Sequence, residues 1–297
     1  MIKVNDIEVK IGKFPDGTPE MLHVDNLTIY NVTDHHNVPK INFSWHYGDD
    51  SELVKLIYLV NHYRSKHGRN AEYNLYMPYI PNARMDRTKN NTEVFTLKWF
   101  AKIINSLEFD NVYVLDPHSD VSVALLDNVV KMNVERYIID TFSEIIKDNP
   151  EKEIVIYFPD AGAYKRYKDM YCVKNNKKIY GEKVRDWNTG EILGLKVVDE
   201  SGTEITDKDY LKDKIVLMID DIISYGGTLY YSALKIKDFN PYKIYAYATH
   251  VETMSLWDTT GRGIFSTLLK DKTVENLFTT NSIYSFEDSE YVKVWNI

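Results

Sequence analysis

Residues 214–228, KIVLMIDDIISYGGT, decide the fold that the sequence predicts. Residues 215–219 form a short, continuous apolar run, which is typical of a strand buried on both faces of a sheet. Residues 228–239 carry apolar side chains at helical spacing, so the turn between the two segments joins a strand to a helix. Gly226 and Gly227 let the backbone approach a ligand closely, and the free amides at a helix start favour a phosphate.

Two adjacent acids, Asp220 and Asp221, follow the apolar run at the carboxyl end of the predicted strand. Carboxylates in this place can accept hydrogen bonds from ribose hydroxyls or bind a metal ion. Glycine-bearing turns between strands and helices are common, however, so the turn alone also fits an ordinary connection with acidic residues.

Length, charge and cysteine content limit the classes of protein to consider. The 297 residues correspond to about two domains of ordinary size. The net charge of -8 gives no basic surface for nucleic acid. No apolar run approaches the roughly 18 residues of a membrane span, and the start, MIKVNDIEVK, lacks a signal peptide's apolar region. We therefore expect a cytoplasmic protein that binds neither nucleic acid nor membranes.

The single cysteine, Cys172, excludes an internal disulfide and a cysteine-rich zinc site. We interpret it as a bystander and not as a nucleophile.

Strand-like and helix-like patterns alternate along the chain, which indicates an α/β fold. In the first series we expect helices over residues 51–67 and 94–107 and strands over residues 73–77 and 111–115. In the second series we expect a helix over residues 137–147 and strands over residues 154–158, 215–219 and 243–249. The predicted domains are residues 1–135 and 136–297.

Residues 169–213, between two predicted strands, are polar and rich in turn-forming residues. A mobile lid and an inserted hairpin explain this segment equally well. Lys183 and Arg185 lie in it two residues apart, so in an extended conformation both side chains would point the same way. Together they could close on a polyphosphate.

Other polar residues follow predicted strands, and each has an ordinary structural explanation when taken alone. His118 lies between Asp116 and Asp120, where a capping acid and a surface histidine would be unremarkable. Asp160 precedes Gly162, Lys165 and Arg166, and such basic residues are often solvated. Arg84, Asp86 and Arg87 form a charge cluster that also fits a solvated loop. His250 ends a predicted strand, where a histidine is most often structural.

Six motifs, taken in order, resemble those of the ribose-phosphate pyrophosphokinases over roughly residues 10–283. They are FPDG at Phe14, ARMDR at Ala83, VLDPHSD at Val114, PDAG at Pro159, DDIISYGGT at Asp220 and ATH at Ala248. An ordered series is far more specific than any one motif. The resemblance implies two type I phosphoribosyltransferase-like domains, each a mainly parallel sheet flanked by helices, and a homo-oligomer, either a dimer or a hexamer.

The resemblance also implies a reaction. The β,γ-diphosphoryl group of MgATP would pass to the anomeric hydroxyl of ribose 5-phosphate, giving phosphoribosyl pyrophosphate (PRPP) and AMP. ATP would be a co-substrate and Mg²⁺ the cofactor. The N-terminal domain would bind ATP, and the C-terminal domain would bind the ribose phosphate and carry a flexible catalytic loop over residues 173–212.

The functional residues of the family correspond to particular positions in this chain. The ATP site would comprise Phe14 and Asp16 from a neighbouring subunit together with Arg84, Asp86 and His118. His118 and Asp160 match the magnesium-associated residues, and Lys183 and Arg185 match the catalytic Lys-x-Arg. Asp220 and Asp221 would face the ribose, and the 5-phosphate loop would comprise Ser224, Tyr225, Gly226, Gly227 and Thr228. Diphosphoryl transfer is accelerated by cations near the transferring group, which agrees with roles for magnesium, Lys183 and Arg185.

The chain departs from the family pattern in several places. The family usually has about one more βα unit before FPDG, so the resemblance implies a shortened first domain. Thr18 stands where the family usually has Glu, Met85 where it has Gln, and Ser224 with Tyr225 where it has Asp-Thr. The first two changes lie in the motifs that correspond to the ATP site, and the last lies in the loop that corresponds to the 5-phosphate site.

Other functions stay open at this point. An aromatic ring in place of a carboxylate would suit an acceptor larger than a plain 5-phosphate, although neutral drift explains the change too. The runner-up is the same chemistry on ADP-ribose, known among phage-encoded relatives in NAD metabolism. A phosphoribosyltransferase would not need the ARMDR and FPDG segments, and a noncatalytic regulatory subunit could lose Lys183 and Arg185, so both readings are less favoured.

Overall fold

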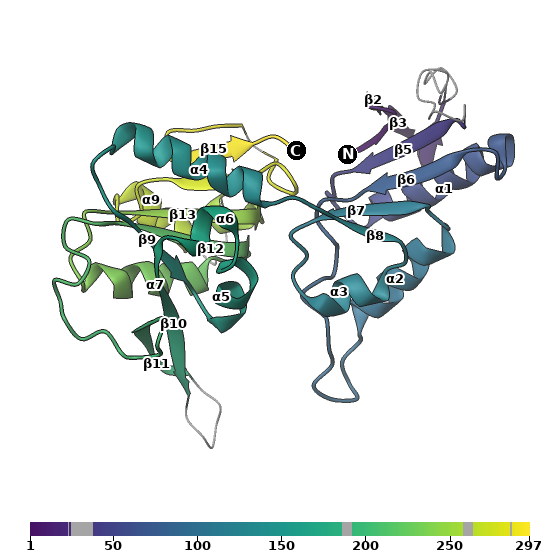
Figure 1. The fold of residues 1–297 in the computed structure, drawn as a ribbon. Helices are drawn as coiled ribbons and strands as arrows, with labels where there is room; N and C mark the ends of the chain where they lie inside the picture. Colours follow the sequence, from purple (N-terminus) through teal and green to yellow (C-terminus); the bar gives the residue numbers. More distant parts are fainter. Residues whose placement is uncertain (23, 25–37, 186–191, 258–263, 286) are drawn as a thin grey trace. The chain divides into compact units, whose positions relative to one another are not determined.

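The computed structural model describes residues 1–22, 24, 38–185, 192–257, 264–285 and 287–297. The chain divides into two compact units, Met1–Asn133 and Val134–Ile297 (Figure 1). Both units are built on a mainly parallel sheet flanked by helices, so the predicted fold class is confirmed. The division falls two residues before the boundary predicted from the sequence.

The sheet of the first unit has the strand order β2-β1-β5-β6-β7-β8. Its four parallel strands are β5 (Lys40–Trp45), β6 (Glu72–Tyr76), β7 (Asn111–Leu115) and β8 (Val129–Met132). The antiparallel strands β1 (Ile2–Val4) and β2 (Ile7–Glu8) extend the sheet beyond β5. A separate hairpin consists of β3 (Ile11–Lys13) and β4 (Pro19–Met21).

Three helices accompany this sheet: α1 (Ser51–His67), α2 (Thr96–Ser106) and α3 (Asp120–Leu125). The buried residues of α1 and α2 recur at helical spacing and join the core against the alternating Ile41, Phe43 and Trp45 of β5. Full burial of each such large apolar side chain stabilises the fold by about 1.5–3 kcal/mol. The chain leaves α1 at Gly68, whose φ of 57° is accessible to glycine at little cost.

The sheet of the second unit has the order β11-β10-β9-β12-β13-β14-β15. The strands are β9 (Ile154–Phe158), β10 (Lys177–Arg185), β11 (Ile192–Asp199), β12 (Ile215–Ile223), β13 (Lys243–Val251), β14 (Leu277–Thr280) and β15 (Val292–Trp295). All pairs are parallel except β10 with β11. The interior strand β9 is buried along its whole length, as expected for a parallel sheet covered on both faces.

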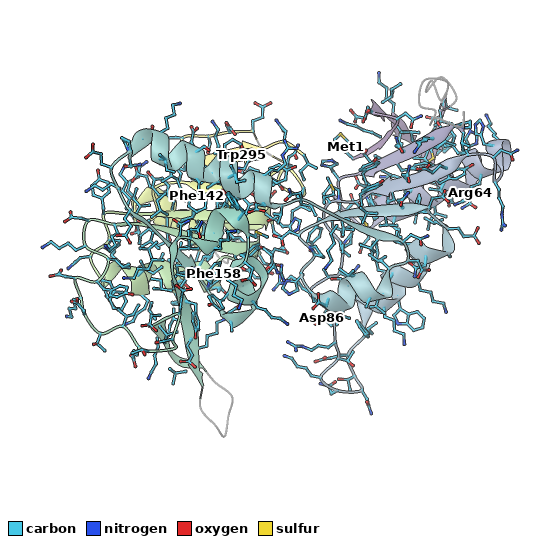
Figure 2. The ribbon with its side chains drawn as sticks, viewed as in Figure 1. Met1, Arg64, Asp86, Phe142, Phe158 and Trp295 are labelled. Carbon is cyan, nitrogen blue, oxygen red and sulfur yellow. The ribbon has the colours of Figure 1, made fainter. Side chains whose placement is uncertain are left out.

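Helices cover both faces of this sheet, and Figure 1 shows α4 and α7 on opposite sides of it. The helices are α4 (Glu135–Asp148), α5 (Ala161–Tyr167), α6 (Tyr171–Lys174), α7 (Gly227–Lys237), α8 (Met254–Trp257) and α9 (Phe265–Lys270). Trp295 of β15 donates from Nε1 to Thr141 of α4 over 3.0 Å, beside Phe142 (Figure 2). Among the described residues, no helix has the length and apolar character to span a membrane.

Two details differ from the sequence-based expectation. The strand predicted over residues 215–219 continues to Ile223, because Ile222 and Ile223 pair with His250 and Val251 of β13. Asp220 and Asp221 therefore lie within the strand and not beyond its end.

The polar segment between β9 and β12 is also more regular than the predicted flexible loop, and its described part agrees with the hairpin alternative. Its described part contains α6 and the antiparallel β10–β11 hairpin, while residues 186–191 of the predicted catalytic loop lie outside the described residues.

Candidate functional site

The carboxyl ends of the parallel strands in the second unit bring several of the predicted site residues to one edge of the sheet. Asp160 follows β9 after Pro159, and Asp220 and Asp221 lie near the end of the adjacent strand β12. Lys183 lies far along β10, which neighbours β9 on its other side. This edge is where α/β sheets usually bind their ligands.

Asp160 has two structural roles at this edge. One carboxylate oxygen caps α5, accepting hydrogen bonds from the amides of Gly162 at 2.9 Å and Ala163 at 3.1 Å. Such capping is typical of an aspartate that precedes a helix. The other oxygen lies 3.9 Å from Nζ of Lys183, and the Asp160 side chain is 48% exposed. The structure therefore brings the predicted metal ligand and the predicted catalytic lysine together.

Lys183 reaches this position on an extended hairpin. The parallel pairing of β10 with β9 ends at Tyr180 and Phe158, and β10 then continues against β11, where Lys183 is opposite Leu195. The register shifts between Val184 and Arg185. The backbone of Arg185 is extended as predicted, but its side chain lies outside what the structure describes, so its predicted direction stays a prediction.

The adjacent acids Asp220 and Asp221 have different environments. Asp221 is buried, and its Oδ2 lies 3.1 Å from Nη1 of Arg166 on α5. Asp220 accepts a hydrogen bond from the amide of Asp221 over 2.9 Å. Burial raises the pKa of Asp220 well above its ordinary value, and the nearby carboxylates of Asp221 and Asp160 raise it further. A cationic ligand, or a ribose hydroxyl that donates to Asp220, would offset the free-energy cost of ionising its carboxyl group.

The predicted phosphate loop joins β12 to α7. Gly226 has a φ of 82°, and a Cβ placed there would lie 2.5 Å from the Cβ of Phe265. Both its conformation and its surroundings therefore require glycine. α7 begins at Gly227, and the first-turn amides of an 11-residue helix face the loop. Thr228 and Tyr225 are exposed, so the loop is open to a ligand.

Sequence reasoning missed one residue at this loop. Glu252 follows β13, and its Oε2 accepts a hydrogen bond from Oγ of Ser224 over 2.7 Å. Its amide also donates to the carbonyl of Ile223 over 2.8 Å. A charged residue three positions after a predicted strand was the available signal, but only the register of β12 and β13 places it opposite Ser224.

A cavity of about 540 Å³ lies between the β10–β11 hairpin and the first turns of α7. It is lined by Lys183, Gly194 and Leu195 from the hairpin and by Gly227, Thr228, Tyr231 and Ser232 from α7. The lining thus combines an amine and helix-start amides with an apolar side chain and the exposed Tyr231. Ser232 Oγ is held by the hydroxyl of the buried Tyr157 at 2.9 Å.

In the first unit, two neighbouring loops carry the predicted nucleotide-binding residues. Arg84 and Asp86 lie in the loop after β6, and His118 lies in the loop after β7. Figure 2 labels Asp86. The two strands are parallel neighbours, and the amide of Leu115 donates to the carbonyl of Pro78 over 2.9 Å, so the loops start side by side. Arg84 is exposed, and Asp86 lies 3.8 Å from Nε of Arg87.

The FPDG motif forms the tight turn of the β3–β4 hairpin. The amide of Phe14 donates to the carbonyl of Thr18, and Gly17 has a φ of 86°. Asp16 Oδ1 accepts from both the amide and the hydroxyl of Thr18, and these hydrogen bonds lower the pKa of Asp16. Thr18 therefore stabilises the turn, and Phe14 is 48% exposed beside it.

Comparison with known proteins adds information on the whole chain. No protein-family model matches the chain. It is 26% identical over 255 residues to the ribose-phosphate pyrophosphokinase of Sulfurisphaera tokodaii, which covers 84% of this chain and 78% of that protein. The same enzyme from Thermococcus kodakarensis is 26% identical over 248 residues, 82% of this chain and 78% of that one.

The chain is a divergent relative of the ribose-phosphate pyrophosphokinases. Its fold agrees with this, because the crystal structure of phosphoribosylpyrophosphate synthetase from Mycobacterium smegmatis matches it with a TM-score of 0.69. That match covers 97% of this chain and 86% of the other chain at 16% identity. The resemblance inferred from six motifs is thus confirmed.

Magnesium, the cofactor predicted from the sequence, fits the oxygen donors of the site. Asp160 offers a half-exposed carboxylate oxygen, the type of ligand that Mg²⁺ prefers. The described residues hold no cluster of three or more His, Cys, Asp or Glu side chains that could bind a metal. Mg²⁺ usually keeps several waters and binds nucleotide phosphates, so one protein carboxylate suits it.

Some sequence-predicted residues lie away from this chemistry. His250 is buried, and its Nδ1 lies 2.8 Å from Oγ of Ser282, so it is a hydrogen-bonded structural histidine. Burial raises the pKa of the Cys172 thiol to about 12, and the neighbouring Glu135 contributes. The thiol is therefore neutral at physiological pH, which agrees with its interpretation as a bystander.

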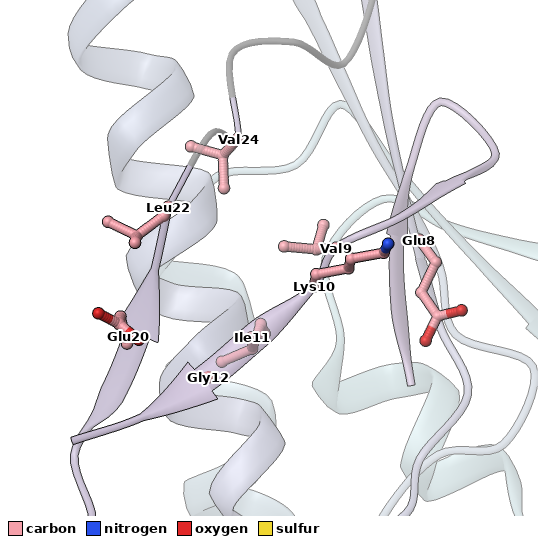
Figure 3. A pocket seen from close by; sticks show the side chains of 8 residues that line it. All are labelled: Glu8, Val9, Lys10, Ile11, Gly12, Glu20, Leu22 and Val24. Carbon is pink, nitrogen blue, oxygen red and sulfur yellow. The ribbon is translucent and has the colours of Figure 1, made fainter. Parts of the chain in front are cut away.

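A second cavity, of about 440 Å³, lies beside the β3–β4 hairpin of the first unit (Figure 3). It is lined by Glu8, Val9, Lys10, Ile11, Gly12, Glu20, Leu22 and Val24. None of the predicted site residues of this pyrophosphokinase relative is among them.

Proposed function

We propose that the protein is a ribose-phosphate diphosphokinase, which transfers the β,γ-diphosphoryl group of MgATP to the anomeric hydroxyl of ribose 5-phosphate and releases AMP. The observation that carries this proposal is the approach of Lys183 Nζ to Asp160, at 3.9 Å, on the sheet edge that also carries the acidic pair and the glycine-bearing loop. The names of its curated relatives support the same reaction class.

The acceptor would bind in the second unit. The amides at the start of α7 suit its 5-phosphate, because a helix start presents free N–H groups and positive dipole charge. Asp220 lies within the strand that leads into the loop and would accept hydrogen bonds from the ribose hydroxyls. Arg166 compensates the charge of Asp221, so Asp221 would position its neighbour and need not pair with the ligand.

Cations would neutralise the negative charge of the diphosphoryl group that is transferred. Mg²⁺, held by Asp160 with nucleotide oxygens and water, would supply charge at the transferring group. Lys183, set beside Asp160, would add an ammonium donor, and Arg185 on the same strand would add a guanidinium. Such charges accelerate transfer because they stabilise the transition state more than the bound substrate.

The nucleotide would bind to the first unit. Arg84, Asp86 and His118 lie in loops that start side by side, which supports a shared role in ATP binding. Phe14 and Asp16, at the exposed tip of the β3–β4 turn, would reach the ATP site of a neighbouring subunit. The active protein would then be a homo-oligomer, a dimer or a hexamer.

A second candidate function is the same transfer to ADP-ribose. The cavity of about 540 Å³ beside Thr228 supports it, because a plain 5-phosphate would leave most of that space unfilled. Leu195 and Tyr231 in its lining suit a nucleoside, and the exposed ring of Tyr225 stands in the loop itself. Ribose 5-phosphate remains the first candidate because the names of the relatives contain ribose phosphate.

The proposal is tested by AMP formation from MgATP in wild-type protein and in Lys183→Ala. We expect the variant to lose turnover by at least about a hundredfold, with ATP binding much less affected, because the lysine acts on the transition state. Lys196→Ala is the matched control, since Lys196 lies on the same hairpin but pairs with Glu204 at 2.8 Å. Equal losses of turnover in the two variants would contradict the role of Lys183.

A further inference from the structure

We propose that Tyr157 is a positioning residue for diphosphoryl transfer, whose hydroxyl group sets the place of Lys183 relative to the start of α7. The inference rests on the proposed function, because that function assigns Lys183 to the transferring group. The relationship that carries it is the contact between the Tyr157 side chain and the backbone of Gly181, two residues before Lys183 on β10.

The hydroxyl group of Tyr157 is anchored inside the second unit. The side chain leaves β9 and is fully buried, and its hydroxyl donates a hydrogen bond to Oγ of Ser232 over 2.9 Å. Ser232 is also buried, and it lies in the second turn of α7, the helix whose first turn follows the glycine-bearing loop. Buried hydroxyl groups are costly to leave unpaired, so this hydrogen bond ties the phenol oxygen to α7.

The base of the β10–β11 hairpin rests on this oxygen. A Cβ placed at Gly181 would overlap the Tyr157 oxygen and would lie 2.8 Å from the carbonyl oxygen of Pro159. Closely packed interiors leave no space for such an overlap, so only a glycine lets β10 pass here without moving. Pro159 immediately precedes Asp160, so the same contact sets the hairpin against the residue that caps α5.

The position of Gly181 determines that of Lys183. The parallel pairing of β10 with β9 ends at Tyr180, and the register against β11 stays regular through Lys183. Side chains two residues apart in a strand point the same way and are separated by about 7 Å. A displacement of the backbone at Gly181 is therefore passed on to the ammonium group of Lys183.

The cavity of about 540 Å³ shows what this arrangement aligns. Lys183 from the hairpin and Thr228 and Ser232 from α7 line the same space. Tyr157 contacts the hairpin at its base and α7 at Ser232, so one buried side chain sets the distance between the two walls. The transferring group, between the lysine and the acceptor phosphate, requires that distance to be held closely.

Gly181→Ala tests this role by pushing the hairpin away from β9 and α7. A misplacement of about 1 Å can slow a reaction about a hundredfold, so we expect kcat for AMP formation to fall by about ten- to a hundredfold. KM for MgATP should change little, because the lysine acts on the transition state. Tyr157→Phe should lower kcat less, since it removes the hydrogen bond to Ser232 without adding an overlap.

The double variant separates positioning from a general loss of packing. Tyr157→Phe removes the nearer of the two oxygens that an alanine at position 181 would meet, and the remaining Pro159 carbonyl requires a smaller movement. The double variant should therefore turn over faster than Gly181→Ala alone. Two independent structural losses would add instead, so a double variant no faster than Gly181→Ala would overturn the inference.

Tyr245→Phe is the matched control. Tyr245 is a buried tyrosine on β13, and its hydroxyl accepts a hydrogen bond from Nδ2 of Asn149 over 3.3 Å. Its removal should lower stability as Tyr157→Phe does, but it should leave kcat unchanged. Equal losses of kcat in the two phenylalanine variants would also overturn the role of Tyr157.

The failure of the proposed function gives a different result, because wild-type protein would then form no AMP with ribose 5-phosphate or ADP-ribose. In that case the rate at which acetic anhydride acetylates Lys183, measured by mass spectrometry, reports its position. The Lys183 side chain is 29% exposed beside Asp160, so Gly181→Ala should raise this rate relative to that of Lys196 on the same hairpin. The double variant should restore the wild-type ratio, and an unchanged ratio in Gly181→Ala would overturn the inference.

Discussion

Arg166 Nη1 lies 3.1 Å from Asp221 Oδ2, and this ion pair joins α5 to the strand that carries the acidic pair. The Asp221 side chain is only 9% exposed, so its charge needs a partner within the fold. The contact links the helix that follows β9 to the acids of β12, where the amide of Asp221 donates a hydrogen bond to Asp220.

Removing the arginine should therefore destabilise the second unit. We expect Arg166→Met to lower the free energy of unfolding by about 3–5 kcal/mol, because it removes the ion-pair partner of a buried carboxylate. Urea denaturation would measure the change. The double variant Arg166→Met with Asp221→Asn should recover most of the loss, and a double variant as unstable as the single one would argue against the ion pair as the cause.

The raised pKa of Asp220 predicts that the stability of the fold depends on pH. The carboxyl of Asp220 binds its proton more tightly in the folded protein than in the unfolded chain, where its pKa is about 3.9. The free energy of unfolding therefore falls as the pH rises from that value through the folded pKa. Asp220→Asn should therefore be more stable than wild type at neutral pH, with the difference shrinking as the pH approaches about 4. The variant should also lose turnover if Asp220 binds the ribose.

Urea titrations at several pH values would measure this dependence. Asp169→Asn serves as the control because Asp169 is exposed, and its difference from wild type should stay nearly constant with pH. A stability gain of Asp220→Asn that does not grow with pH would be inconsistent with a raised pKa.

Gly226 and Gly227 are adjacent but should respond differently to substitution by alanine. Gly226→Ala meets both an unfavourable φ and the Cβ of Phe265, so we expect a loss of at least about 1–2 kcal/mol and weaker acceptor binding. Gly227→Ala meets no atom within 4 Å and lies in a helix, so it should be neutral or slightly stabilising. Thermal unfolding of both variants tests this, and similar losses would contradict the geometry of the loop.

The cavity beside α7 predicts a selective effect of Tyr231. Tyr231→Ala should lower kcat/KM for ADP-ribose by about three- to tenfold through loss of an aromatic contact, and should change kcat/KM for ribose 5-phosphate much less. Tyr171→Ala is a suitable control because Tyr171 is 72% exposed and does not line the cavity. A similar loss with both acceptors would assign Tyr231 a structural role.

Much of the fold was predictable because long amphipathic helices and buried strands have strong local patterns. The helix expected over residues 51–67 and the strands expected over residues 111–115 and 154–158 agree with the structure residue by residue. The six-residue helix α3 and the short strands β14 and β15 were missed, because segments of this length contain too few residues to show a period.

The site was predictable in its residues but not in its contacts. The motifs indicated Asp160 and Lys183 separately, whereas their approach depends on β10 continuing past the end of β9. The raised pKa of Asp220 depends on its burial and on the carboxylates of Asp221 and Asp160. Glu252 could not be placed from local sequence, because only the β12–β13 register sets it beside Ser224.

The most direct test of the proposed reaction is to identify both products formed from MgATP and ribose 5-phosphate, using ATP labelled with ³²P at the β-phosphate. We predict that unlabelled AMP is released and that the label moves to a sugar product heavier by one diphosphate. The label would move in the same way with ADP-ribose if that is the acceptor. Labelled ADP would show transfer of a single phosphoryl group and would contradict the account, as would the absence of any labelled sugar product.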